Sequence, residues 1–222
     1  MRCVPACSMQ TSATASPCPA IIPDATRSTI PRLDRREVRT FLALTCNDPH
    51  RDLWAVALGT GMRRGELLGL RWSDVAPNQT SVRVAVSLTV IDGRPQLKST
   101  KTNRVRNLSI DAHTAAAIRR QGRAATVSDR SLVFTDSTGD PLIPQRITHR
   151  FRRLVRRLPL PTIRLHDLRH THATLLLQAG VPIKVVSERL GHTTVALTLD
   201  TYAHVLPAMD RDAAERFGDL LA

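Results

Sequence analysis

The sequence predicts a mainly α-helical fold with a small antiparallel β-sheet, an α+β class. Three observations lead to this prediction. Apolar residues recur with helical spacing over most of the chain after residue 30. Residues 82–90 instead place valine or leucine at every second position, which is typical of a strand with one buried face. Asp92-Gly93 then follows, and this dipeptide is a strong signal for a hairpin turn.

The length and composition allow one large domain. The chain has 222 residues, of which 42% are hydrophobic, and this is enough to bury a proper core. Residues 1–30 mix Cys, Ser, Thr, Ala and Pro without periodicity, so we expect a tail or the remnant of a linker there. Residues 31–222 are expected to form the folded domain.

Helix signals mark the start of that domain. In "LDRREVRTFLAL", Asp34 is a good N-cap and Glu37 completes a capping box. A second helix is expected to begin at Asp48-Pro49 and to stop at Gly59 and Gly61.

After the predicted hairpin, a third short strand is expected over residues 104–110. Asp111 then opens an alanine-rich helix, and "RITHRFRRLVRRL" predicts a strongly basic one. Further helices are expected from His166 onward, with breaks at Gly180-Val181-Pro182 and at Gly191.

The charge indicates a polyanionic partner. Lys and Arg number 32 against 19 Asp and Glu, which gives a net charge of +13. Nucleic acid fits better than a membrane because no segment is apolar for 18 residues. The basic charge could equally serve solubility, and the arginines of residues 150–157 form either a backbone-contacting face or a solvated one.

The cysteines and the N-terminus indicate a compartment. The four cysteines form no Cys-x-x-Cys pair and three lie in the first 30 residues, which argues against a disulfide framework and a zinc ribbon. The N-terminus lacks an apolar signal region. A reducing cytoplasm is therefore the expected location.

The stretch "IRLHDLRHTHATLLLQAG" gathers polar chemistry on one helix face. His166, Arg169 and His170 stand at i, i+3 and i+4. Two histidines four residues apart could bind zinc, but a zinc hydrolase needs a glutamate after the first histidine, and here Asp167 follows it. The cation of Arg169 also opposes a metal. A solvated polar face is the remaining alternative for this stretch taken alone.

Two further stretches add candidates. "GTGMRRGELLGLRW" places Arg63 after a glycine-rich break at the start of a helix, where anions bind readily. "ERLGHTTVALTLDTYAHV" places His192 after Gly191 and carries Tyr202, the sole tyrosine of the chain, ten residues later. On spacing alone, Tyr202 could be a plain core residue at the end of a docked helix.

Together these stretches resemble the catalytic domain of the tyrosine recombinases, the phage integrase family. The resemblance runs from about Arg32 to Leu221. It is carried by "TGMRRGE", "TKT", "HDLRHTHAT" and "LGHTT…TYAHV", in the family's order and approximate spacing. It implies the following catalytic set: the arginines Arg63 and Arg169, the histidines His166 and His192, the nucleophile Tyr202, and the hairpin lysine Lys101, with Lys98 as the fallback.

The resemblance also implies the reaction, which is site-specific DNA recombination. The phenol of Tyr202 attacks a DNA phosphate while His166 assists the proton transfer, because a phenol with a pKa of about 10 is otherwise a poor nucleophile. The arginines and a histidine hold the phosphate oxygens, and Lys101 protonates the departing 5′ oxygen. A 3′-phosphotyrosyl link keeps the phosphodiester energy, so no ATP, metal or other cofactor is expected. The implied partners are double-stranded DNA and further copies of the chain in a tetramer.

Several expectations accompany this assignment. Glu66 and Asp167 either orient the arginines and histidines or are ordinary acids at helix starts. Three other histidines could contact the phosphate or simply be polar or packed: His170, His172 and His204. The terminal segment carries an apolar helical stripe that either docks on a neighbouring protomer or folds back: Met209, Ala213, Phe217 and Leu220.

Members of this family usually carry a separate N-terminal helical domain, whereas only about 30 unpatterned residues precede the catalytic domain here. Two alternatives therefore stand beside recombination. One is a catalytically idle DNA-binding remnant, and the other is a DNA-relaxing enzyme like the type IB topoisomerases.

Overall fold

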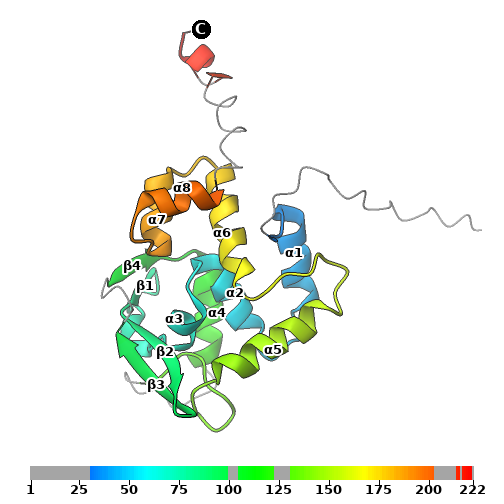
Figure 1. Ribbon diagram of the computed structural model, residues 1–222, viewed down its shortest axis with the longest axis vertical. Coiled ribbons are helices and arrows are strands. Elements are labelled where there is room, and N and C mark those ends of the chain that lie inside the picture. Colours follow the sequence, from blue (N-terminus) through cyan, green and yellow to red (C-terminus); the bar gives the residue numbers. More distant parts are fainter. Residues whose placement is uncertain (1–30, 100–104, 123–130, 203–213, 216, 222) are drawn as a thin grey trace, which may run out of the picture.

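The computed structural model describes residues 31–99, 105–122, 131–202, 214–215 and 217–221. These ranges form a mostly helical domain with short antiparallel strands, which confirms the predicted class (Figure 1). The elements in chain order are α1 Arg35–Leu44, α2 Arg51–Thr60, α3 Arg64–Leu68, the 3-10 helix η1 Trp72–Asp74, β1 Ser81–Val84, β2 Val86–Ile91, β3 Arg94–Ser99, β4 Arg106–Ser109, α4 Ala112–Gly122, α5 Pro144–Val155, α6 Asp167–Gln178, α7 Ile183–Leu190 and α8 Val195–Tyr202.

The first two helices begin and end through local contacts. The capping box of α1 is confirmed, since the Asp34 carboxylate accepts from the Glu37 backbone N–H at 2.7 Å and the Asp34 N–H donates to Glu37 at 2.8 Å. Helix α2 begins at Arg51, later than expected, because Asp48 instead closes a turn by accepting from the His50 N–H at 2.8 Å. Gly61, with φ of 63°, then ends α2 in the left-handed conformation that glycine adopts without strain.

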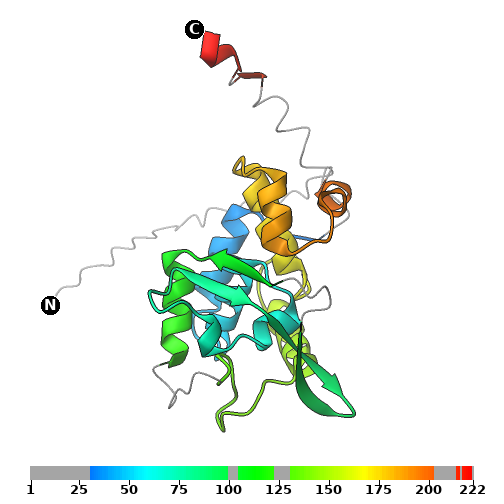
Figure 2. The ribbon, with the colours of Figure 1, turned by 90° about the vertical axis from the view of Figure 1, so that its left-hand side faces the viewer.

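The predicted single sheet is instead two separate two-stranded sheets. β1 pairs with β4 and β2 pairs with β3, both antiparallel. Between the two pairings, one side of the sheet has a single residue, Ala85, and the other side has six residues, 100–105. Because the two connections differ in length, the residue-by-residue pairing does not continue from one sheet into the other. The Asp92-Gly93 turn has positive φ at both positions, 49° and 74°, as a two-residue hairpin requires. Figure 2 shows the β2–β3 hairpin projecting beyond the helices.

Two apolar cores hold the described residues together. The larger one surrounds α2, where the Trp54 ring packs edge-on to Phe151 with 5.1 Å between ring centroids. The smaller one joins α6, α7 and α8 through buried residues: Ala173, Leu177, Val186, Leu190 and Tyr202. Helix α6 contributes Leu168 to the first core and Leu177 to the second. Its polar residues between these positions therefore lie where the two cores meet.

No helix in the described ranges is both long and apolar enough to cross a bilayer. Residues 217–221 are helical and expose large apolar side chains, with Phe217 63% and Leu220 83% exposed. Met209 and Ala213, the other members of the predicted apolar stripe, lie outside the described residues.

Candidate active site

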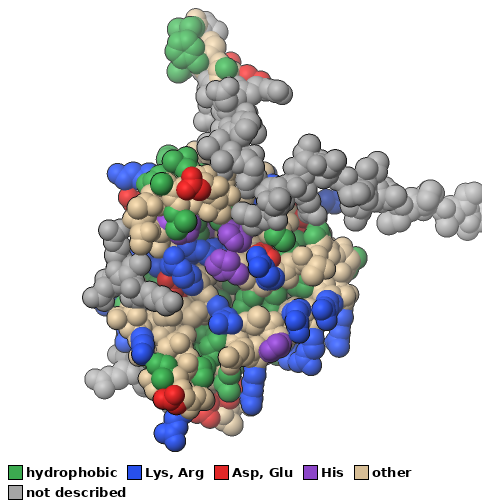
Figure 3. Space-filling view, viewed as in Figure 1, with side chains coloured by type: hydrophobic (Ala, Val, Ile, Leu, Met, Phe, Trp, Pro, Cys, Tyr) green, Lys and Arg blue, Asp and Glu red, His purple; other side chains and the backbone are tan. Residues whose placement is uncertain are grey.

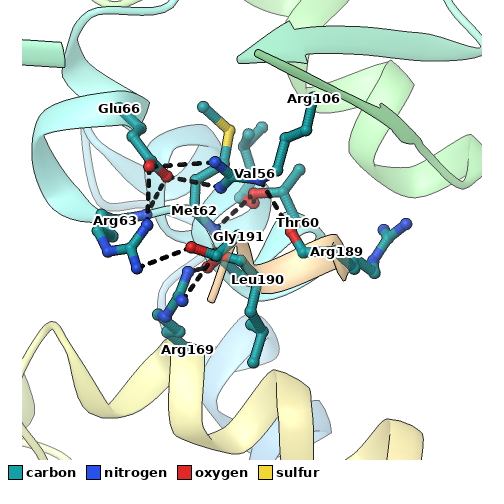
Figure 4. A network of polar contacts seen from close by, with 11 residues as sticks. Val56, Thr60, Met62, Arg63, Glu66, Arg106, Arg169, Arg189, Leu190 and Gly191 are labelled. Atoms are coloured by element: carbon teal, nitrogen blue, oxygen red, sulfur yellow. Dashed lines mark hydrogen bonds and ion pairs between the residues drawn. The ribbon is translucent and has the colours of Figure 1, made fainter. Parts of the chain in front are cut away.

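The two predicted catalytic arginines meet at the C-terminal end of α7. Arg63 is the N-cap of α3, and its Nη2 donates to the Gly191 carbonyl at 3.1 Å (Figure 4). Arg169 extends from α6 and is buried; its Nη1 donates to the Gly61 carbonyl and its Nη2 to the Leu190 carbonyl, both at 2.7 Å. Backbone oxygens thus fix both guanidinium groups, although the two residues lie far apart in the sequence.

Glu66 links Arg63 to a third arginine. Its carboxylate accepts from the backbone N–H of Arg63 at 2.9 Å and from the Nη1 of Arg63 at 3.1 Å. Arg106 on β4 donates to both oxygens of the same carboxylate, at 3.1 and 2.7 Å. Burial raises the pKa of Glu66, but the hydrogen bonds and charges of Arg106 and Arg63 outweigh that effect and lower it. The carboxylate is therefore ionised, and orienting Arg63 is its role in the structure.

Arg106 is not among the candidates that the sequence motifs indicate, yet the sequence contains a signal for it. In a strand, residues two apart point to the same face. Leu108 on β4 is buried, so Arg106 lies on the buried side of its strand. An arginine on a buried strand face needs a partner, and here the partner is Glu66.

His192 follows Gly191 directly and lies beside the arginines. Its Nδ1 is 2.7 Å from the Thr198 Oγ1 on α8, which orients the ring. Burial, followed by the charges of Arg169 and Arg63, lowers the pKa of His192 to about 4. The imidazole is neutral near pH 7 and has a second nitrogen available for another partner.

Tyr202 is buried in the smaller core, with 1% of its surface exposed. Its hydroxyl lies 2.9 Å from the Nδ1 of His170 on α6. Burial raises the pKa of Tyr202 to about 12, against the opposing charge of Arg169, while burial lowers the pKa of His170 to about 4. Both groups are therefore neutral near pH 7, and His170 is the histidine in contact with the phenol.

His166 lies next to His170 rather than at the phenol. The two rings meet edge to face with centroids 5.0 Å apart. Partial burial and the Arg169 charge lower the pKa of His166, although the side chain reaches the surface. The structure thus brings His166 and His170 together on one face of α6, as the spacing predicts.

The remaining candidates have different surroundings. Lys101 and His204 lie outside the described residues, while the fallback Lys98 is exposed on β3 opposite Ser87. Asp167 accepts from the Arg164 N–H at 2.7 Å and from its guanidinium, so it orients Arg164. His172 is buried between the Leu58 carbonyl, at 2.7 Å, and the Nε of Arg189, at 3.0 Å, which is a packing role.

The arrangement can bind an anion at the surface. The cations of Arg63, Arg106 and Arg169 outnumber the single carboxylate of Glu66, and 42% of the Arg63 side chain is exposed. Histidine side chains and basic side chains gather on the same face of the molecule, below α8 (Figure 3). Fixed guanidinium donors and neutral imidazoles suit the oxygens of a phosphodiester.

Solved structures with this fold include complexes with DNA. The Tn1549 transposon integrase bound to transposon right end DNA matches with a TM-score of 0.74 and 26% identity, over 89% of this chain and 69% of that one. The catalytic domain of bacteriophage HP1 integrase matches with a TM-score of 0.57 and 25% identity, over 84% of this chain and 94% of that one.

Curated relatives and a family model agree with the structures. The chain is 31% identical over 191 residues to a tyrosine recombinase XerC-like protein of Caldanaerobacter subterraneus, covering 76% of this chain and 49% of that protein. It is 30% identical to the ICEBs1 integrase of Bacillus subtilis, covering 83% and 53%. The chain therefore spans about half the length of these relatives. The model of the phage integrase family matches residues 31–209. The chain belongs to the phage integrase family.

Proposed function

We propose that residues 31–222 form the catalytic domain of a site-specific recombinase, which cleaves and rejoins DNA through a 3′-phosphotyrosyl intermediate. The observation that carries the proposal is the pairing of a tyrosine hydroxyl with a histidine beside two arginines that backbone carbonyls hold in place.

In the proposed cleavage step, the Tyr202 oxygen attacks the phosphorus and the bond from phosphorus to the 5′ oxygen breaks. The phenolic proton passes to His170, with His166 next to it as the group that carries the proton outward. Arg63, Arg169 and His192 bind the phosphate oxygens, which gain negative charge in the transition state. Lys101 supplies a proton to the departing 5′ oxygen. Attack by another 5′-hydroxyl reverses each of these transfers and needs no external energy source.

The buried position of the phenol adds a requirement. A hydroxyl on a residue that is 1% exposed cannot reach the phosphate of a duplex. The end of α8 must therefore shift relative to α6 and α7 before cleavage, so that the phenol meets the phosphate while its hydroxyl stays within reach of His170.

Double-stranded DNA is the proposed substrate and partner. The net charge of +13 and the exposed arginines of α5 support binding to the DNA backbone, and a structural neighbour at 26% identity is bound to DNA. Assembly of several copies on DNA, a tetramer in the complete reaction, is part of the same proposal. The exposed apolar side chains of residues 217–221 supply a surface for contact between copies.

A trapping experiment tests the proposed function. A duplex nicked near the cleavage position loses a short fragment after attack, so the covalent adduct accumulates and can be seen on a denaturing gel. We expect an adduct with the wild-type chain and none with Tyr202→Phe, whose duplex affinity should stay unchanged because only a hydroxyl is removed. An adduct formed by the phenylalanine variant would show that the nucleophile is another residue.

The same assay separates the alternatives. Duplex binding without an adduct would favour the idle DNA-binding remnant. Relaxation of supercoiled DNA at protein levels below those of DNA would favour an enzyme like the type IB topoisomerases. EDTA should leave adduct formation unchanged, and strong inhibition by EDTA would favour a metal-dependent reaction.

A further inference from the structure

Three consecutive backbone carbonyls at the end of α7 each accept a hydrogen bond from a different arginine. Arg189 O accepts from the Nε of Arg106 at 3.0 Å. Leu190 O accepts from Arg169 at 2.7 Å, and Gly191 O accepts from Arg63 at 3.1 Å (Figure 4). The last carbonyls of a helix lack partners within the helix and carry partial negative charge. The end of α7 thus collects three cations that come from β4, α6 and the start of α3.

Arg106 directs its guanidinium inward, unlike Arg63. Its two Nη atoms donate to the two carboxylate oxygens of Glu66. Its Nε donates to the backbone carbonyl of Arg189. Only 12% of the Arg106 side chain is exposed, against 42% for Arg63. Arg63 therefore has donors that face solvent and can meet a phosphate, whereas all three guanidinium nitrogens of Arg106 donate to Glu66 or to the Arg189 carbonyl.

Gly191 shows how closely Arg106 lies against the turn that precedes His192. A Cβ on Gly191 would lie 2.8 to 3.2 Å from the Nη1, Cζ and Nε atoms of Arg106. Its φ of 69° also favours glycine. The guanidinium therefore packs directly on the backbone of Gly191, and His192 is the next residue.

We propose that Arg106 is a positioning residue, which aligns Glu66 and Arg63 with the carbonyls at the end of α7 and so fixes the arginines and His192 before DNA binds. The proposal rests on the proposed function for its kinetic consequence. Without Arg106, Arg63 is the remaining described donor to the Glu66 carboxylate, which is 3% exposed. The Glu66 carboxylate should then lose its fixed position, and the Arg63 guanidinium should lose its fixed orientation toward an incoming phosphate.

Arg106→Ala and Arg106→Lys test this role, with Arg83→Ala as the matched control. Arg83 is exposed on β1, in the same two-stranded sheet as Arg106, and its replacement removes the same charge. At saturating protein, the single-turnover rate of adduct formation should fall by about tenfold in both Arg106 variants, because a lysine cannot reproduce a two-sided guanidinium contact. Duplex affinity should stay within about twofold of that of Arg83→Ala.

A double variant separates positioning from a general loss of structure. In an Arg63→Ala background, the additional Arg106→Ala change should slow cleavage little further, since residues that act through one another are not additive. A full additional tenfold loss, or wild-type cleavage rates in both single Arg106 variants, would overturn the proposal.

The order of the Arg63 side chain gives a readout that does not depend on activity. Relaxation of the Arg63 ¹⁵Nε signal should report a more mobile guanidinium in Arg106→Lys than in the wild type and Arg83→Ala. If the wild type forms no adduct, the proposed recombinase activity fails, while this measurement still decides the positioning role. An equally ordered Arg63 in the Arg106→Lys variant overturns it, and the lysine variant, which keeps the positive charge, serves if Arg106→Ala does not fold.

Discussion

Arginine occurs in two contrasting settings in this molecule. In the cluster of Arg63, Arg106 and Arg169 at the end of α7, carbonyls and one carboxylate hold every guanidinium. On the basic face of α5 and the turn after it, the side chains are exposed: Arg146, Arg152, Arg153, Arg156 and Arg157 (Figure 3). The comparison shows that position, rather than residue type, separates guanidinium groups with fixed orientations from guanidinium groups exposed to solvent.

The physical basis of the contrast is the surroundings of each charge. Charges that water and salt surround are screened over about 8 to 10 Å, so the basic face acts mainly through the number of its cations. Charges held inside the protein interact more strongly and need no rearrangement when negative charge develops nearby. Substitutions in the two settings should therefore change different measured quantities.

The largest effect is expected in the cluster at the end of α7. Arg169→Ala and Arg63→Ala should each slow adduct formation by about 100-fold or more, since the loss of one preorganised donor to a developing anion has that size. Binding of the duplex should change far less than the rate. Single-turnover cleavage at saturating protein measures the rate, and a loss of only two- or threefold would place these arginines outside the site.

A smaller effect, on affinity alone, is expected from the basic face. Replacing Arg152, Arg153 and Arg156 by glutamine should make the dependence of log affinity on log salt less steep. The magnitude of its slope should fall by about 0.9 for each DNA phosphate that the variant no longer neutralises. The cleavage rate at saturation should remain that of the wild type.

The matched control for the basic face lies on α1, where Arg35, Arg36 and Arg39 are also exposed. Their replacement by glutamine removes the same charge. Salt titrations of duplex binding should separate the two triple variants, and equal slopes would contradict a specific role for the basic face.

The smallest effect concerns stability and sharpens the contrast between buried and exposed histidines. Burial, and then the Arg189 charge, lowers the pKa of His172 to about 4 from an ordinary 6.5. As the pH falls, His172 takes up a proton in the unfolded chain before it does so in the folded chain. The folded state therefore has its full stability above pH 6.5 and loses stability as the pH falls toward 4. This group alone should lower the free energy of unfolding by roughly 2 kcal/mol between pH 7 and pH 5.

Urea unfolding at pH 7, 6 and 5 measures the slope of the free energy of unfolding against pH. His172→Gln should flatten it, whereas His149→Gln, at an exposed position on α5, should leave it as in the wild type. An unchanged slope in the His172 variant would show that another group governs acid sensitivity.

Local signals in the sequence predicted most helix ends and the hairpin turn, and the family motifs supplied the candidate site residues, but neither predicted Arg106 or the contacts between distant segments. The capping box at Asp34, the Asp92-Gly93 turn and the helix end at Gly191 all follow from chemistry within a few residues, and all were predicted. The division of the strand at Ala85 and the link from Arg106 to Glu66 depend on pairings across the fold. Such pairings have no local pattern, so only the three-dimensional structure shows them.

The three carbonyls at the end of α7 have a consequence for the timing of synthesis. Arg63 and its acceptor Gly191 are separated by 128 positions. At 5 to 20 residues per second, a ribosome needs roughly 6 to 26 seconds to cover that interval. Throughout this interval the growing chain already displays Arg63 but lacks both the helix end that orients it and the tyrosine. The proposed site is therefore assembled only when the last segments of the domain have been made.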